Sequence, residues 1–206
     1  MRPHLRVTCT IGLLALSIVT SGMAQRHHGS HLKEIPRNYR DGFWLGFSVG
    51  AGNESFRFEN DPAGYSNDIT APTFSLRLGG TPSQNWLLGA ELFAWMDGDL
   101  NNYYDEYSNV LTSAMLIGQF YPIRQGGLYI KGGVGVAGNY IRTISPSGFI
   151  VRDEESGLAT VFGAGLDLRV GRNVSITPTV DVHHQFFNRS DVRERIVSLG
   201  VGVTFH

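Results

Sequence analysis

The chain has 206 residues, of which 42% are hydrophobic and 17% charged, with a formal net charge of −1, 26 glycines and a single cysteine. A soluble domain carries roughly a quarter charged residues and about 7% glycine, so this chain is poor in charge and rich in glycine. The low charge excludes a disordered chain and a coiled coil, and the single cysteine excludes a disulfide-stabilised scaffold. No stretch after residue 24 approaches the ~20 apolar residues of a membrane-spanning helix, which excludes a helical membrane bundle. The length predicts one domain or at most two.

Residues 1–24 have the order of features that is typical of a secretory signal peptide. Arg2 and Arg6 precede an apolar run, and small residues follow it up to Ala24. We expect cleavage after Ala24, which leaves residues 25–42 as a periplasmic tail and a mature chain without cysteine. A membrane anchor helix is the alternative, although the apolar run is short and polar residues follow it directly.

From Phe43 onward the hydrophobic residues alternate with a period of two, which is typical of β-strands. The pattern predicts eight strands, at 43–56, 71–80, 86–96, 109–121, 127–140, 157–170, 173–186 and 194–206. In the last of them Val197, Leu199 and Val201 fall on one face, and serine, glycine and threonine fall on the other. Strand 109–121 is the exception, because neither of its faces is clearly polar.

The glycine-rich face decides the class of fold. Glycine cannot build a hydrophobic core, but it can line the narrow interior of a small barrel. The aliphatic face must then point outward, and only lipid makes that tolerable. Backbone groups in lipid have no water to bind, so the strands must close without a free edge. We therefore predict an all-β fold, a closed antiparallel up-and-down transmembrane β-barrel of eight strands over residues 43–206.

The connections between the predicted strands alternate in length. Residues 57–70, 97–108 and 141–156 form long connections and 187–193 an intermediate one, whereas those at 81–85, 122–126 and 171–172 are short. Outer-membrane barrels have short periplasmic turns and longer extracellular loops. The long connections carry an excess of acidic residues, and the tail with the short turns an excess of basic ones. We expect acidic loops outside the cell and both termini in the periplasm.

Two segments resemble a known family. Residues 118–136 run from an aromatic-proline turn into a glycine-rich strand, and the last strand alternates apolar residues up to Phe205. Both are similar to the small outer-membrane β-barrel family of the OmpA/OmpX type. The resemblance implies a place in the bacterial outer membrane, among bilayer lipids and lipopolysaccharide. It also implies that the barrel-assembly machinery reads Val201, Val203 and Phe205 as its signal, although His206 departs from the family's aromatic ending.

Six charged residues fall on the inward face of the predicted strands. They are Arg77, Glu91, Lys131, Asp167, Arg169 and Asp181. The first four lie three to five residues from the short turns, and hence at similar heights, with Arg169 just below. Buried charges are costly unless they are paired, so we predict a plug of ion pairs across the lower lumen. A gated proton or ion path is the alternative.

Other motifs point to no chemistry. Lipid A deacylases are eight-stranded barrels with a His-x-Ser motif, but no serine stands at the second position after His183 or His184. Residues 97–108 begin like a calcium loop, yet Asn102 and Ser108 replace its glycine and glutamate, which leaves loose divalent-cation binding by an acidic loop as an alternative. The histidines at 27, 28 and 31 are weak evidence for a metal.

We therefore assign no catalytic, cofactor-binding or metal-binding residue and expect no nucleic-acid partner. The favoured function is that of a monomeric, non-enzymatic outer-membrane barrel with a plugged lumen, which serves a structural or surface-interaction role through its acidic loops. A small transport conduit, such as one for apolar molecules, and a lipid-modifying enzyme are the alternatives.

Overall fold

The computed structural model describes residues 40–58, 66–98, 106–144, 150–187 and 192–206. The predicted signal peptide, its cleavage site and nearly all of the predicted tail lie outside the described residues. Among the described residues, no helix is long and apolar enough to cross a membrane.

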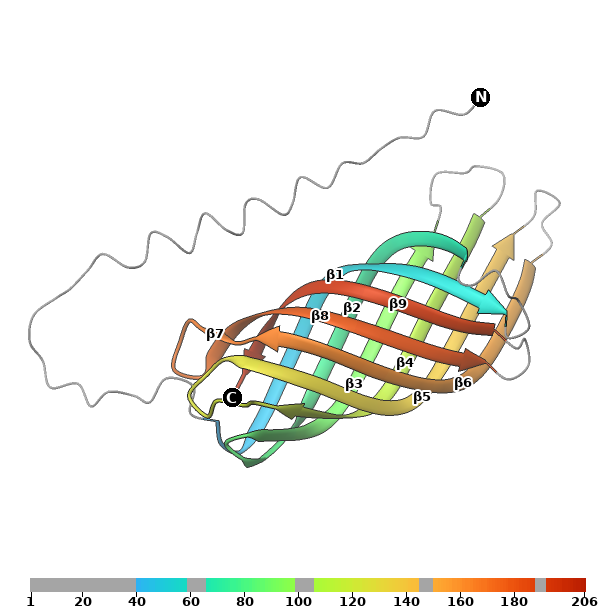
Figure 1. Cartoon of the computed structure of the whole chain (residues 1–206). Helices are drawn as coiled ribbons and strands as arrows, with labels where there is room; N and C mark the ends of the chain where they lie inside the picture. The colour runs from blue at the N-terminus through green and yellow to red at the C-terminus, as the bar shows by residue number, and fades with distance from the viewer. Residues whose placement is uncertain (1–39, 59–65, 99–105, 145–149, 188–191) are drawn as a thin grey trace, which may run out of the picture. The chain divides into compact units, whose positions relative to one another are not determined.

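Eight antiparallel spans make up the described part of the chain (Figure 1). The strands are β1 (Phe43–Phe58), β2 (Ser66–Ser83), β3 (Trp86–Gly98), β4 (Glu106–Phe120), β5 (Leu128–Ile144), β6 (Ile150–Leu166), β7 (Leu168–Arg169), β8 (Val174–Phe187) and β9 (Val192–Phe205). The short β7 continues β6 after an interruption at Asp167, and both pair with β8. The single predicted strand 157–170 is thus broken near its end.

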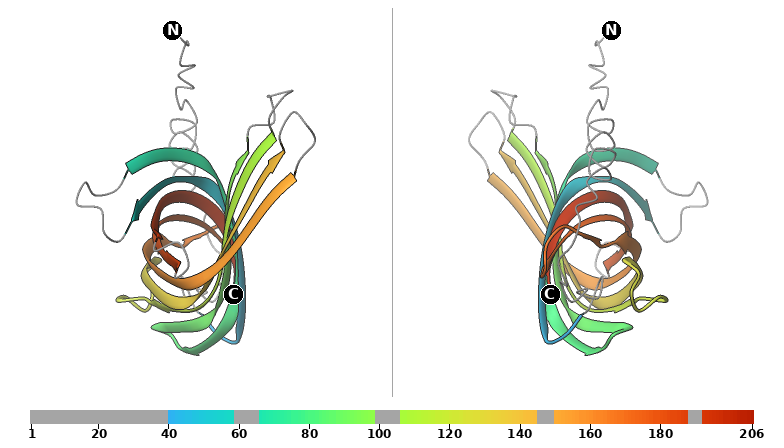
Figure 2. Two further views of the ribbon diagram at one scale, coloured as in Figure 1. Left: turned by 90° about the vertical axis from the view of Figure 1, so that its right-hand side faces the viewer. Right: turned by 90° about the vertical axis from the view of Figure 1, so that its left-hand side faces the viewer.

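The sheet closes on itself. From β1 to β6 each strand pairs with the next, β6 and β7 both pair with β8, β8 pairs with β9, and β9 returns to β1. Figure 2 views the barrel from its two ends. The predicted closed, up-and-down, all-β barrel of eight strands is confirmed. We call the end with the connections at 84–85, 121–127 and 170–173 the turn end, and the other the loop end.

The register sets the width of the barrel. A walk through paired residues that starts at Leu45 of β1 passes Leu78 and Arg195 and returns to β1 at Ser55, ten residues further along. With a rise of about 3.3 Å per residue and a strand separation of about 4.8 Å, this stagger gives a tilt of about 40° and a backbone radius of about 8 Å. So narrow a tube has room inside for side chains and for little else.

Small residues are needed where the walls come closest. Gly79 of β2 and Gly89 of β3 are paired. A Cβ added at Gly79 would run into the backbone oxygen of Leu88, whereas a Cβ at the neighbouring Gly80 would point into open space. The glycines on the inward face therefore permit tight curvature, as the composition predicts.

The aliphatic side chains cover the outside of the barrel. On β3 this band runs from Trp86 to Met96, which are 47% and 40% exposed and ten residues apart. At about 2.5 Å of height per tilted residue the band is about 25 Å tall, the hydrophobic height of an outer-membrane barrel. The aliphatic face therefore points outward, as the alternation of glycine with aliphatic residues predicts.

The structure explains why neither face of β4 is clearly polar in sequence. Its inward residues Leu111, Met115 and Ile117 are buried, and its outward residue Leu116 is 73% exposed. Both faces are apolar because this stretch of the interior is packed with hydrophobic and aromatic groups, among them Trp95 and Phe93.

The strands are longer at the loop end than the alternation predicts. The hairpins continue to Phe58, Gly98, Ile144 and Phe187, so the connections shorten to 59–65, 99–105, 145–149 and 188–191. Beyond the apolar band both faces of a hairpin can be polar, so the period-two signal ends before the strand does.

Candidate functional site

Four charged side chains form a cluster across the lumen in the lower half of the barrel, which we call the central cluster. The Lys131 ammonium on β5 donates to both carboxylate oxygens of Glu91 on β3, at 3.0 and 2.8 Å, and lies 3.1 Å from Oδ1 of Asp181 on β8. Arg77 is opposite Glu91 in the register and donates to the Tyr129 hydroxyl at 2.9 Å. All four charged groups are buried. Two cations and two anions from four strands thus tie the walls together in a neutral set.

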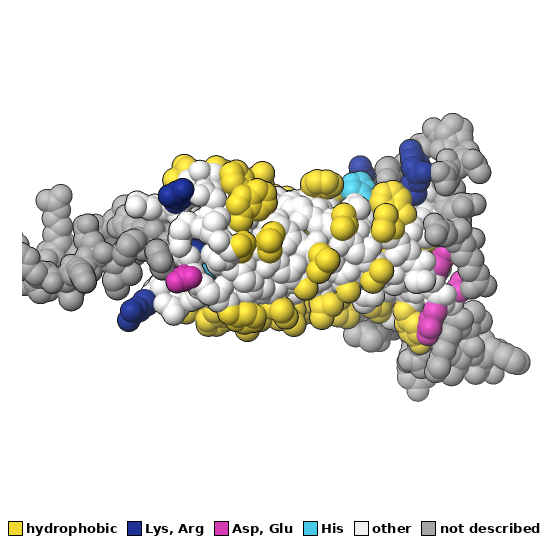
Figure 3. All heavy atoms as spheres, turned by 90° about the horizontal axis from the view of Figure 1, so that it is seen from below, with side chains coloured by type: hydrophobic (Ala, Val, Ile, Leu, Met, Phe, Trp, Pro, Cys, Tyr) yellow, Lys and Arg dark blue, Asp and Glu magenta, His cyan; other side chains and the backbone are white. Residues whose placement is uncertain are grey.

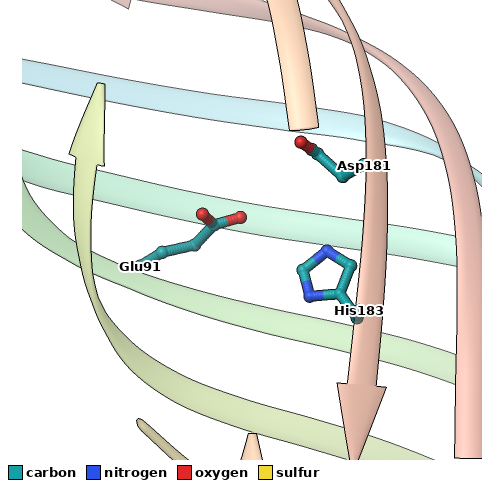
Figure 4. Close-up of side chains that lie close together, drawn as sticks. All are labelled: Glu91, Asp181 and His183. Atoms are coloured by element: carbon teal, nitrogen blue, oxygen red, sulfur yellow. The ribbon is translucent and has the colours of Figure 1, made fainter. Parts of the chain in front are cut away.

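His183 lies above this cluster. Its ring stacks on Phe93 with centroids 3.7 Å apart and an interplanar angle of 16°, and within the described residues neither ring nitrogen has a hydrogen-bond partner. Figure 4 shows Glu91, Asp181 and His183 turned toward one another, and one ligand atom from each lies within 4.8 Å of the others. A transition metal accepts these donors, but the Lys131 ammonium already lies between the two carboxylates. The resident cation of the cluster is therefore a protein side chain.

A second cluster surrounds Asp167 at the turn end. Its carboxylate accepts hydrogen bonds from the Tyr121 hydroxyl at 2.8 Å and the Thr177 hydroxyl at 2.9 Å. Nε2 of His206 lies 3.4 Å away and Nη2 of Arg40 3.8 Å away. Asp167 stands in the break between β6 and β7, which lets its carboxylate reach the barrel mouth.

Arg40 closes this mouth from below. Its guanidinium lies 3.5 Å from the centroid of the Tyr121 ring and donates to the backbone oxygens of Arg124 and Gly126 at 3.2 and 2.7 Å. The side-chain amide of Gln84 binds the Arg40 backbone on both sides, accepting from its N–H at 3.1 Å and donating to its carbonyl oxygen. Arg40 is 1% exposed, so it is part of the barrel interior.

The sequence did not predict that Arg40 is part of the interior, because in sequence this residue is one of several basic residues of the predicted tail. The available signal was the Asp41–Gly42 pair before the first strand. Gly42 has a φ of 74°, which side chains other than glycine rarely adopt. That turn directs the preceding residue back under the barrel.

The six predicted lumen charges are divided by the structure. Arg77, Glu91, Lys131 and Asp181 are brought together in the central cluster, and Asp167 lies in the turn-end cluster. Arg169 is half-buried at the turn end and donates to the backbone oxygen of Arg172 at 3.0 Å. The strand neighbours expected to share one layer, Lys131 and Asp167, therefore have different partners.

The residues of the predicted assembly signal lie on the lipid-facing wall. Val201 is 51% exposed and Phe205 40% exposed, and Phe205 packs on Phe47 with ring centroids 6.4 Å apart. Val203 shares this face and is half-buried. The departing residue, His206, turns inward to Asp167 instead of continuing the outward row.

The upper interior holds apolar groups together with buried polar ones such as Glu54, Gln185 and Glu194. Trp95, Leu111 and Ile196 are fully buried. The Trp95 indole donates to the backbone oxygen of Gly52 at 2.9 Å. An interior cavity bordered by Ser48, Thr179, Ser198 and other residues has a volume of about 10 Å³, which is room for about one water molecule.

A closed barrel with an apolar outer band about 25 Å tall and a polar, filled interior is an integral membrane β-barrel of the outer-membrane class. The chain belongs to the outer membrane protein beta-barrel domain family, whose model matches residues 11–205. A search of curated protein sequences found no match.

Two solved structures illustrate the shared fold. The attachment invasion locus protein Ail of Yersinia pestis, solved in complex with the heparin analogue sucrose octasulfate, is similar at a TM-score of 0.60 and 13% identity, over 80% of this chain and 99% of that chain. Neisserial surface protein A is similar at a TM-score of 0.51 and 14% identity, over 81% of this chain and 98% of that chain. At these identities the likeness concerns the fold.

Proposed function

We propose that the protein is a non-enzymatic barrel of the bacterial outer membrane whose lumen is closed by its own side chains. The short turns and both termini face the periplasm, and the loop end faces outside. The protein then acts at the cell surface through its loops, in a structural role or by contact with a surface partner. Its immediate surroundings are bilayer lipid and lipopolysaccharide.

The observation that carries this proposal is the filled interior. Two polar clusters, around Lys131 and around Asp167, span the lower half, and Trp95 with its buried neighbours, apolar and polar, fills the upper half. A continuous water path through a tube of about 8 Å backbone radius would need these groups to move. Removing a charge from its buried partners costs several kcal/mol, which supports a permanently closed state.

Conductance across a planar bilayer tests the closed lumen. Purified wild-type protein, checked for folding by its heat-dependent gel mobility, should insert and give no steady openings. A general porin in the same bilayers serves as the positive control for insertion. Steady unitary currents from the wild-type protein would contradict a closed lumen.

Location and orientation need a separate experiment. Membrane fractionation should place the protein in the outer membrane, and protease treatment of intact cells should cut only at the loop end. The amino-terminal residue of the mature protein, found by mass spectrometry, should be Gln25. Cleavage by external protease at the short turns would reverse the proposed orientation.

One observation favours the transport alternative. A groove of about 460 Å³ opens on the outer wall across β1–β4 and is lined by apolar residues that include Phe47, Phe74 and Leu92. It could admit an apolar molecule from the side, but the interior cavity nearest to it is about 10 Å³. Faster uptake of an apolar dye in expressing cells would favour this conduit. Changed lipid A mass in the same cells would favour a lipid-modifying enzyme.

A further inference from the structure

Four side chains form a basic rim patch on the outside of the barrel near the loop end. They are Arg57 of β1, His184 of β8 and Arg193 and Arg195 of β9. In the register Arg57 faces Arg193 and His184 faces Arg195, so the four are direct neighbours across three strands. Figure 3 shows a histidine beside basic side chains toward the loop end.

The alternation along the strands points these side chains outward. The residues between and beside them in sequence, Glu194, Ile196, His183 and Gln185, are buried in the interior. Among the described residues, the outward positions of β1, β8 and β9 include no acidic residue. The charged side chains at the described outward positions of these three strands are therefore all basic.

The height of the patch matches a lipid headgroup. Arg195 lies ten residues along β9 from Phe205, the exposed aromatic residue at the turn end. At about 2.5 Å per tilted residue the two are about 25 Å apart along the axis, which is the height of the apolar band. Val197, the next outward residue below Arg195, is 39% exposed and belongs to that band. The patch thus begins where acyl chains end.

Neighbouring groups hold the patch against the wall. Nη2 of Arg195 donates to the Ser55 hydroxyl at 3.2 Å. The Arg193 guanidinium lies 5.9 Å from the centroid of the Phe186 ring, and the His184 ring lies 6.4 Å from the same ring at an interplanar angle of 22°. Like charges opposite each other in a sheet destabilise it, and an anion shared between them offsets that repulsion.

We propose that the basic rim patch binds the phosphate monoester of an outer-leaflet glycolipid of the lipid A type. Guanidinium groups match phosphate oxygens in paired hydrogen bonds, and a monoester carries more negative charge than a phosphodiester. The three arginines also interact within the chain, so the lipid adds a partner to an arrangement that the protein already holds. The inference rests on the proposed function, since it requires the loop end to face the outer leaflet.

Native mass spectrometry of lipid retention provides the test. The protein is folded into phosphatidylcholine nanodiscs doped with either diphosphoryl lipid A or the same lipid without its phosphates. Wild-type protein should retain the phosphorylated lipid about tenfold more than the dephosphorylated one. The R193Q/R195Q variant should lose this preference. The matched control R124Q/R172Q removes two exposed arginines at the turn end and should keep it.

Each outcome decides the inference. Equal retention of both lipids by the wild-type protein would overturn it without any variant, as would equal retention of lipid A by the patch and control variants. Heat-dependent gel mobility shows whether each variant is folded. Since fractionation and protease cleavage test the proposed function independently, a correctly placed barrel with no phosphate preference would remove only the patch.

Discussion

Replacing Lys131 with methionine tests the central cluster most directly. The variant keeps most of the side-chain volume and removes the ammonium that lies between Glu91 and Asp181. Oxygens of these two carboxylates lie within 4.8 Å of each other. Two unit charges at that distance repel by about 3 kcal/mol at an effective dielectric constant near 20, and breaking a buried ion pair costs about 3–5 kcal/mol by experience with other proteins.

We expect K131M to lower the unfolding midpoint by about 10 °C, from roughly 2–4 °C per kcal/mol for a chain of this size. The assay is the loss of heat-dependent gel mobility in detergent or vesicles. Neutralising one carboxylate in the same background, as K131M/D181N, should restore much of the loss, because the remaining Arg77 and Glu91 charges are opposite and balanced. A midpoint shift below about 2 °C for K131M, or no recovery in the double variant, would refute the reasoning.

Three further predictions use the same assay. Gly79→Ala should destabilise the barrel by more than about 2 kcal/mol because the added Cβ meets the backbone of the neighbouring strand, whereas Gly80→Ala should be near neutral. Equal effects of the two substitutions would contradict the close approach of β2 and β3. Leu199 and Ile123 are both 66% exposed, but Leu199 lies in the apolar band and Ile123 in a turn. Leu199→Arg should lower the free energy of unfolding by about 2–4 kcal/mol, whereas Ile123→Arg should change it by almost nothing. A small change at both positions would argue against lipid contact. Arg40→Ala should cost about 2–3 kcal/mol through the lost hydrogen bonds and ion pair, and an unchanged midpoint would mean that the turn-end cluster contributes little.

The fold could be predicted because the decisive signal is local. Side chains in a strand alternate between faces, so glycine on one face and valine or leucine on the other identify inside and outside without knowledge of strand pairing. The apolar residues of β9 lie outside for this reason. Strand ends were less predictable, since the alternation disappears where both faces meet water.

The interior was predicted in part. The alternation identified the charged residues that point inward, and the rule that buried charges need partners predicted that pairs would form. It could not choose the partners. Lys131 and Asp167 are on neighbouring strands, but Lys131 reaches across the barrel to Glu91 and Asp181, and Asp167 binds groups at the mouth.

By itself, the sequence determined the class of fold, the direction of each face and five of the buried charges, because these follow from residue type and spacing along one strand. Only the tertiary structure decided which charges meet, that Arg40 and His206 converge on Asp167 at the turn end, and that four basic groups from three strands form one patch. Those contacts depend on the register and the ten-residue stagger of the closed sheet, which bring together residues far apart in the chain.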